Sequence, residues 1–198
     1  MSAFRIVVLA SGSGTNLQAI LDRLHGGGEV EVVGVGSDKP AARALERARA
    51  AGVETAVFAA AEYGDREARD AAIGDWVDER GADLVVLAGY MQLLTTPFLE
   101  RFPGRILNVH PSLLPAFPGV HAVEDALTHG VKVTGATVHF VDEGIDTGPI
   151  VLQEAVEVRE GDTPETLHAR IQAVEHRLLP AAVRLFLDGK LCSPVGAA

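Results

Sequence analysis

Short apolar runs alternate with amphipathic segments through the first half of the chain. The runs that predict buried strands, rich in β-branched residues, are residues 4–10, 30–36, 53–58 and 84–88. The segments between them that predict helices, each ended by glycine within two residues, are residues 17–24, 41–51 and 66–80. Regular alternation of strand and helix predicts a parallel sheet with right-handed crossovers.

The second half changes pattern. A helix start with Pro97 in the first turn, a fifth strand over 105–110 and a short helix over 121–129 come first. Residues 131–141 and 150–158 then alternate enough to form an antiparallel pair. Thr163 and Pro164 begin a long amphipathic helix that reaches about Leu187. The pattern predicts an α/β fold: a Rossmann-like, open, mostly parallel sheet with helices on both faces and an antiparallel C-terminal hairpin.

Length and composition fit one soluble domain. The chain has 198 residues, 47% hydrophobic and 22% charged, so we expect a single domain over 1–190 and a C-terminal tail over 191–198. Cys192 is the only cysteine, which rules out an internal disulfide and fits a reducing compartment. The N-terminus shows no signal-peptide pattern, and no apolar run approaches the roughly 20 residues of a membrane span. We therefore expect a cytoplasmic protein that binds no membrane.

The net charge of −10 argues against nucleic acid as a partner, because non-specific binding relies on a basic surface. It does not exclude an anionic small molecule, since the N-terminus of a helix can hold a phosphate on an acidic protein. We therefore expect small-molecule substrates and no nucleic acid. A monomer or a weak homodimer is compatible with it.

Two polar residues stand at the end of the predicted fifth strand. Asn108 and His110 are two positions apart and therefore share a strand face. Pro111 has no N–H and should end the strand at His110. In an open α/β sheet, ligands bind at the carboxyl ends of strands. A pair of polar residues satisfied inside the core would give the same pattern, so the strand alone leaves both interpretations open.

A glycine-rich loop, residues 11–16 (SGSGTN), follows the first strand and opens the first helix. Gly12 and Gly14 let the backbone approach a ligand, while Thr15 and Asn16 add side-chain donors beside the helix N-terminus. A dinucleotide fingerprint would need a third glycine where Leu17 stands, and the lysine triplet of a P-loop is missing. The loop suits one phosphate, although a plain tight turn is the alternative.

Asp146 lies in a glycine-flanked loop between the last two strands. An Asp in a loop is usually a turn residue. If it faced His110, its charge would favour the imidazolium and create a general acid working near neutral pH. The seven histidines form no HExxH motif and Cys192 is isolated, so we expect no metal.

Taken together, these motifs resemble the folate-dependent phosphoribosylglycinamide formyltransferases of purine synthesis. The matching pieces occur in the family's order and span almost the whole chain: residues 8–18 (VLASGSGTNLQ), 86–91 (VLAGYM), 107–115 (LNVHPSLLP), 137–141 (TVHFV) and 146–149 (DTGP). Each piece is modest alone, whereas the set is highly specific.

The resemblance implies roles for particular residues. The implied catalytic residues are Asn108, His110 and Asp146. Those implied to bind the ribotide phosphate and glycinamide are Gly12, Ser13, Gly14, Thr15, Asn16 and Glu175. The implied folate contacts are Arg66, Met91, Gln92, Leu93, Leu94, Asn108, Val141, Asp142 and Asp146. Gln92 and Ala116 stand where many relatives carry a basic residue, a departure that concerns the acidic tail of the folate and not the chemistry.

The implied reaction transfers a formyl group from 10-formyltetrahydrofolate, a co-substrate, to the amine of 5-phosphoribosylglycinamide on the way to IMP. Asn108 and protonated His110 would stabilise the tetrahedral intermediate, with Asp146 tuning the histidine. A formyltetrahydrofolate deformylase, a methionyl-tRNA formyltransferase and a non-catalytic nucleotide-binding module are alternatives. The length of the chain disfavours the tRNA enzyme. An NAD-dependent dehydrogenase is weakened by Leu17.

Overall fold

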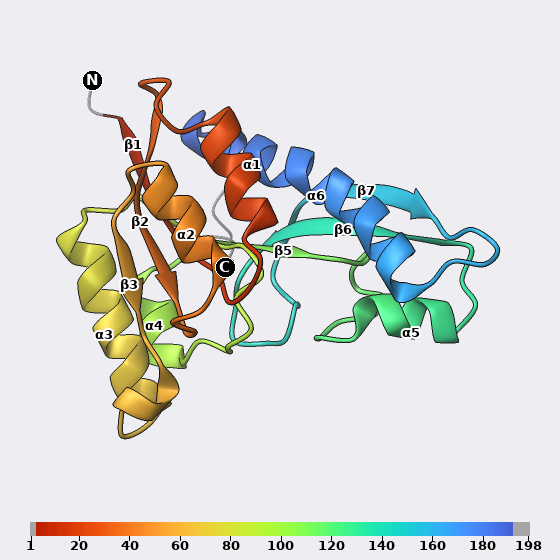
Figure 1. Cartoon of the computed structure of the whole chain (residues 1–198), viewed down its shortest axis with the longest axis horizontal. Coiled ribbons are helices and arrows are strands. Elements are labelled where there is room, and N and C mark those ends of the chain that lie inside the picture. The colour runs from red at the N-terminus through yellow and green to blue at the C-terminus, as the bar shows by residue number, and fades with distance from the viewer. Residues whose placement is uncertain (1–2, 192–198) are drawn as a thin grey trace, which may run out of the picture. The chain divides into compact units, whose positions relative to one another are not determined.

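The computed structural model describes residues 3–191. Its strands are β1 (Phe4–Leu9), β2 (Val30–Ser37), β3 (Thr55–Val57), β4 (Leu84–Leu87), β5 (Ile106–His110), β6 (Val133–Phe140) and β7 (Ile150–Glu157). Its helices are α1 (Thr15–Arg23), α2 (Arg43–Ala50), the 3-10 turn η1 (Ala60–Glu62), α3 (Arg66–Glu79), α4 (Thr96–Arg101), α5 (Ala122–Thr128) and α6 (Pro164–Leu187). Figure 1 labels these elements.

The strand order is β3-β2-β1-β4-β5-β6-β7, which confirms the mostly parallel α/β sheet with a C-terminal antiparallel hairpin. The chain forms two compact units, one ending at Leu107 and the other running from Asn108. Strand β5 therefore begins in the first unit and ends in the second. The expected C-terminal tail lies outside the described residues except for Leu191, and the single domain over 1–190 stays a prediction.

In the first unit, β1 pairs in parallel with β2 and β4, and β2 pairs in parallel with β3. The apolar run that predicted β1 is fully buried from Ile6 to Ala10. Helices α1 and α2 contact each other, as do α3 and α4. The strand order reverses after β3, since β4 pairs with β1, and Figure 1 shows α3 on the opposite face of the sheet from α1 and α2.

One predicted strand is shorter than its apolar pattern. Residues 53–58 give β3 only over Thr55–Val57. The Val53 N–H donates to the Ala48 carbonyl at 2.9 Å and thereby completes the C-terminal turn of α2. A backbone N–H that bonds to a helix end cannot also bond to a neighbouring strand. The apolar run therefore predicted a strand longer than the one that forms.

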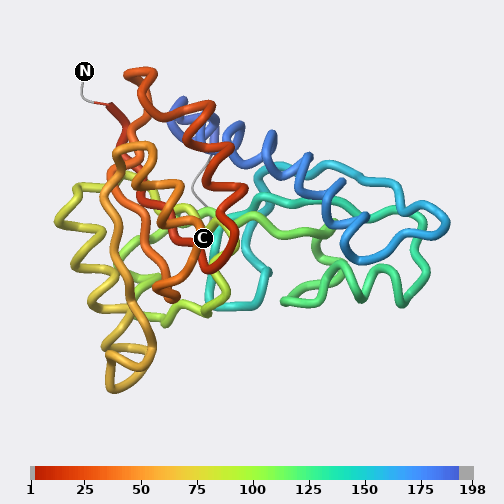
Figure 2. Tube along the Cα trace, viewed as in Figure 1, coloured from red at the N-terminus to blue at the C-terminus, as the bar shows by residue number. Residues whose placement is uncertain are grey.

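In the second unit, β6 and β7 form the predicted antiparallel pair, and α6 packs on both strands. The Thr163 hydroxyl accepts from the Thr166 N–H, and the Thr166 hydroxyl accepts from the Thr163 N–H. This capping box and Pro164 in the first turn fix the start of the helix where the sequence predicted it. Figure 2 follows α6 as one continuous coil, in blue.

Candidate active site

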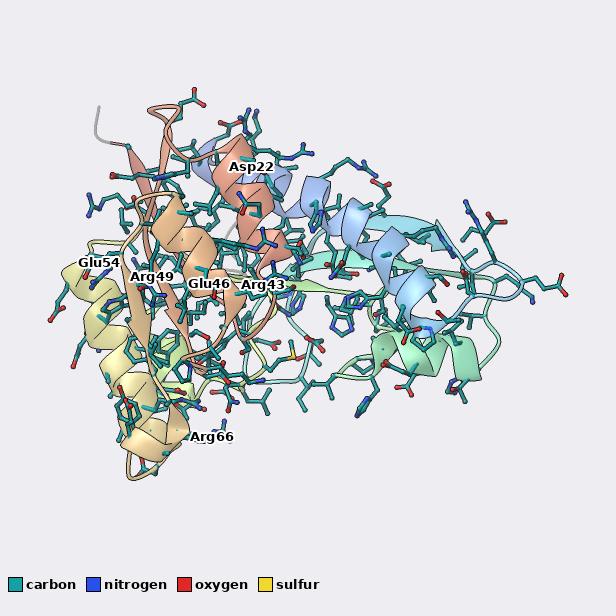
Figure 3. All side chains as sticks on the ribbon, in the orientation of Figure 1. Asp22, Arg43, Glu46, Arg49, Glu54 and Arg66 are labelled. Carbon is teal, nitrogen blue, oxygen red and sulfur yellow. The ribbon has the colours of Figure 1, made fainter. Side chains whose placement is uncertain are left out.

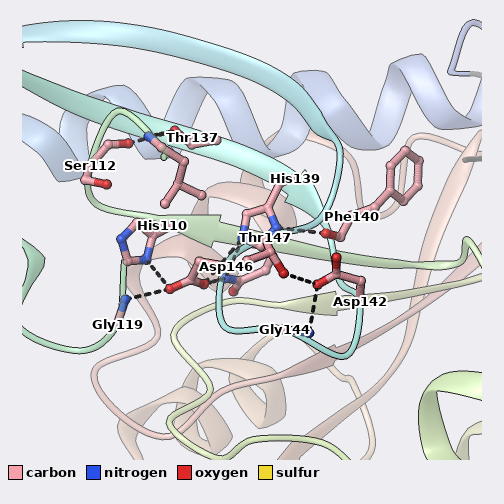
Figure 4. Close-up of polar contacts among 12 residues, drawn as sticks. His110, Ser112, Gly119, Thr137, His139, Phe140, Asp142, Gly144, Asp146 and Thr147 are labelled. Atoms are coloured by element: carbon pink, nitrogen blue, oxygen red, sulfur yellow. Dashed lines mark hydrogen bonds and ion pairs between the residues drawn. The ribbon is translucent and has the colours of Figure 1, made fainter. Parts of the chain in front are cut away.

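Strand β5 ends at His110, as Pro111 predicted, and brings two polar side chains to Asp146. The His110 Nδ1 atom lies 3.3 Å from Asp146 Oδ2, and Asn108 Nδ2 lies 3.4 Å from Asp146 Oδ1. His110 is buried, Asn108 is half-buried, and Asp146 has a left-handed backbone with φ 55°. Figure 4 shows the carboxylate facing the imidazole. The sequence could not show this contact.

Each ring nitrogen of His110 lies near a hydrogen-bond acceptor. Its Nε2 lies 2.8 Å from the Phe117 carbonyl oxygen, and its Nδ1 faces the Asp146 carboxylate. Both partners are acceptors, so only the doubly protonated ring satisfies both. The bond at Nε2 is short, whereas the Nδ1 contact is longer. The contact at Nδ1 is therefore the looser of the two.

His139 on β6 is a site residue to which the sequence gave no role. Its Nε2 lies 3.1 Å from Asn108 Nδ2 and 3.5 Å from Asp146 Oδ1, and its Nδ1 lies 2.8 Å from the Phe140 carbonyl oxygen. The carbonyl requires a proton on Nδ1, while Nε2 can accept from the Asn108 amide in the neutral ring or donate to Asp146 in the cationic ring. Its place inside the matched segment 137–141 was the only signal in the sequence.

The surroundings of Asp146 keep its carboxylate ionised. Burial raises the pKa of Asp146, but the hydrogen bond with His139, the Gly119 N–H at 2.8 Å and the charges of His110 and His139 oppose burial and leave that pKa below its ordinary value. The carboxylate is therefore charged at neutral pH.

The glycine loop lies in the first unit and is held by α2. The Ala44 N–H donates to the Gly12 carbonyl at 3.1 Å, and Arg47 Nε donates to the Ser13 carbonyl at 2.8 Å. Gly14 has φ 70°, and a Cβ there would stand 2.6 Å from the Ala44 Cα atom. Helix α1 begins at the next residue, Thr15, with no side-chain cap from Gly14. The loop thus leads into the N-terminus of α1, and Arg47, to which the sequence gave no role, lies beside it.

Five of the nine residues predicted to contact folate lie in the first unit, namely Arg66 and residues 91–94. Arg66 Nη2 donates to the Leu93 carbonyl at 3.0 Å, and the Met91 N–H donates to Ser11 Oγ at 2.8 Å. Met91 and Leu93 are each 56% exposed, so the loop offers apolar side chains to solvent. Leu94 is half-buried in the same loop. Figure 3 labels Arg66, at the start of α3.

A buried polar network contacts the 91–95 loop. Arg69 donates to Asp70 Oδ1 at 2.8 and 3.0 Å and to Gln92 Oε1 at 3.0 Å, and the Gln92 amide donates to Asp38 at 3.0 Å. The Thr95 N–H donates to Asp70 Oδ2 at 2.7 Å. Gln92 thus bridges Arg69 and Asp38 within the protein.

Three predicted residues lie in the second unit away from the contacts of His110. Asp142 Oδ1 accepts from the Gly144 N–H and the Thr147 hydroxyl, which shapes the loop carrying Asp146. Val141 is half-buried directly after β6, and Glu175 is buried on α6. Within residues 3–191 the structure contains no group of His, Cys, Asp and Glu that could hold a metal. No described helix could cross a membrane.

The formyl transferase family model matches residues 4–183, which is most of the chain. The chain belongs to the formyl transferase family. This membership confirms the formyltransferase that the motifs indicated and places the Asn108, His110 and Asp146 cluster inside the matched region.

Named members of the formyl transferase family are close in sequence and structure. A phosphoribosylglycinamide formyltransferase of Mycobacterium tuberculosis is 53% identical over 179 residues, 90% of this chain and 83% of the relative. That of Escherichia coli K12 is 43% identical, covering 94% of this chain and 88% of the relative. The crystal structure of glycinamide ribonucleotide transformylase 1 from Symbiobacterium toebii superposes with a TM-score of 0.94 at 56% identity, over 96% of this chain and 90% of that chain.

Proposed function

We propose that this formyltransferase moves the formyl group of 10-formyltetrahydrofolate to the primary amine of 5-phosphoribosylglycinamide in purine synthesis. The observation that carries the proposal is the cluster of Asn108, His110 and Asp146, with a carboxylate 3.3 Å from an imidazole whose other nitrogen is also held by an acceptor. The relatives bearing that enzyme name at 43–53% identity support the choice of substrates.

The reaction forms one bond and breaks one. The amine nitrogen attacks the formyl carbon, and the carbonyl oxygen becomes a tetrahedral oxyanion. The carbon–nitrogen bond to the folate then breaks, and the proton lost by the amine goes to the leaving folate nitrogen. The products are tetrahydrofolate and the formylated ribotide, so no covalent enzyme intermediate is required.

The site offers the donors that such an intermediate needs. The Nδ1–H of His110 is only loosely engaged by Asp146, and the Asn108 amide has N–H groups beside it. Turning both toward the oxyanion would supply two hydrogen bonds, one of them charged. Asp146 balances the imidazolium, and a water held by its carboxylate, or His110 itself, would carry the proton between the two nitrogens.

The remaining predicted residues then divide between the two substrates. Gly12, Ser13, Gly14, Thr15 and Asn16 would bind the ribotide phosphate, with Arg47 adding charge, and Glu175 would contact the glycinamide part. Arg66, the 91–94 loop, Val141 and Asp142 would bind the folate. We propose that residues 1–190 act as one formyltransferase domain in this role.

The test is formyl transfer from 10-formyltetrahydrofolate to glycinamide ribotide by wild type and by His110→Ala, with His168→Ala as control. His168 is an exposed histidine on α6. We expect turnover by wild type and the control and a loss of about 10²–10⁴ in kcat for His110→Ala. A wild type that hydrolyses the folate but does not formylate the ribotide would instead be a deformylase.

A further inference from the structure

The hydroxyl of Thr137, in the middle of β6, is fully buried and uses its whole hydrogen-bonding capacity. It donates to the Ser112 carbonyl at 2.7 Å. It accepts from the Leu114 N–H at 3.1 Å and from Gln153 Nε2 at 2.9 Å. A hydroxyl has one proton and two lone pairs, so all three are engaged. Such a group fixes its partners in three directions.

Two of those partners, Ser112 and Leu114, belong to the loop that leaves β5, residues 111–117. Gln153, from β7, also donates to the Leu114 carbonyl at 2.7 Å. The Ser112 hydroxyl donates to the Ala116 carbonyl at 2.5 Å. The loop is thus tied to both strands of the hairpin at its start and closed on itself further along. Removing the Thr137 hydroxyl would leave a buried carbonyl and a buried N–H without partners.

The far end of the same loop and the residues just after it contact His110 and Asp146. Phe117 adopts a left-handed backbone, φ 53°, and its carbonyl accepts from His110 Nε2 at 2.8 Å. Two residues later, the Gly119 N–H donates to Asp146 Oδ2 at 2.8 Å. Figure 4 shows Thr137 beside Ser112, and His110 and Gly119 both facing Asp146.

We propose that Thr137 is a positioning residue for formyl transfer, which fixes the 111–117 loop so that the Phe117 carbonyl orients His110. Gln153 contributes to the same anchor, the set of hydrogen bonds that holds this loop on β6, by donating to the Thr137 hydroxyl and the Leu114 carbonyl. The inference rests on the proposed function of His110. The titratable groups at this cluster are Asp146, which faces the ring directly, and His139, which contacts the same carboxylate. Thr137 touches neither, so it acts only through the loop.

The test compares three variants in steady-state formyl transfer. Thr137→Val keeps the shape and removes the hydroxyl, whereas Thr137→Ser keeps the hydroxyl. Thr134→Val is the matched control, because Thr134 is a buried threonine of the same strand whose hydroxyl has no partner among the described residues. We expect Thr137→Val to lower kcat about 10- to 100-fold with both KM values within about threefold, since misplacing a catalytic group by about 1 Å can cost 10²-fold. Thr137→Ser and Thr134→Val should stay within about threefold of wild type in kcat.

A second readout does not depend on turnover. The ¹⁵N chemical shifts of His110 report how its two ring nitrogens are protonated at pH 7. We expect Thr137→Val to change these shifts and to move the pH dependence of kcat, while the far-UV spectrum stays native. Gln153→Leu, which removes two partly exposed bonds, should do the same to a smaller extent and serves if Thr137→Val does not fold.

The outcomes separate the two proposals. If wild type formylates no ribotide, the proposed function fails, and the His110 shifts still decide whether Thr137 orients that ring. A folded Thr137→Val or Gln153→Leu with wild-type kcat and wild-type His110 shifts would overturn the positioning role. So would a Thr134→Val variant that loses as much activity as Thr137→Val, because the effect would then belong to the strand and not to the anchor.

Discussion

Replacing Asp146 with asparagine removes one charge from the site at nearly constant shape. The carboxylate is 3.3 Å from His110 Nδ1, and the two side chains are only 14% and 5% exposed. Coulomb's law at an effective dielectric constant of about 20 gives an upper bound of about 5 kcal/mol for such a pair, and desolvation reduces it. An opposite charge at this range typically moves a titration by about 1–3 pH units.

We therefore expect Asp146→Asn to move the basic limb of the pH–kcat profile to lower pH by about 1–2 units. A reaction that needs the cationic ring would then lose about 10- to 100-fold in kcat on the alkaline side, because each unit is a factor of ten in the protonated fraction. The sign follows from the charge: a carboxylate favours the imidazolium, so its loss lets the proton leave earlier as pH rises.

The assay is kcat at saturating concentrations of both substrates from pH 5.5 to 9.5. Glu143→Gln is the matched control, since it removes one negative charge from an exposed position in the same loop. Its profile should overlay that of wild type. If Asp146→Asn kept the wild-type profile, or if Glu143→Gln moved it equally, the carboxylate would have no specific partnership with His110.

Further variants test the surrounding structure. Gly14→Ala combines a φ of 70° with a Cβ 2.6 Å from α2, so we expect KM for the ribotide to rise at least about tenfold with KM for the folate unchanged, whereas Gly27→Ala, whose Cβ meets only one atom at 3.9 Å, should have no effect. Arg69→Met strands a buried carboxylate and should cost about 3–5 kcal/mol in urea unfolding, against less than about 0.5 for the exposed Arg49→Met. The lowered pKa of Asp146 means that its stabilising contacts persist above the ordinary Asp pKa and are lost as pH falls through the lowered value. Wild type should therefore lose more stability than Asp146→Asn below about pH 4 in thermal unfolding, and parallel losses would contradict this.

Most of the fold could be predicted from local patterns in the sequence. The apolar run over 4–10 became β1, and Pro111 ended β5 at His110 because proline has no N–H to donate. The alternation over 131–158 became the β6–β7 pair. These features depend on neighbours along the chain, which a sequence displays directly. Asn108 and His110 shared a face for the same reason.

Contacts between distant residues could not be predicted in this way. Asp146 meets His110 across 36 positions, through a left-handed residue in a loop whose path no periodicity describes. His139 was one buried strand residue among several, and its place between Asn108 and Asp146 depends on strand register. Arg69 lies within the helix predicted over 66–80 and was given no role, yet it is 1% exposed, because Asp70 pairs with its charge and Gln92 accepts a hydrogen bond from it. These positions are buried or part of the site because of their contacts with other residues, and a local sequence pattern does not display such contacts.

The most direct test of the account is single-turnover formyl transfer to glycinamide ribotide by wild type and by His110→Ala at pH 7.5, with His168→Ala alongside. The account predicts that wild type and His168→Ala produce formylglycinamide ribotide at the same rate, and that His110→Ala is slower by about 10²–10⁴. Equal rates for wild type and His110→Ala would contradict it, because the imidazolium would then play no part in the chemistry.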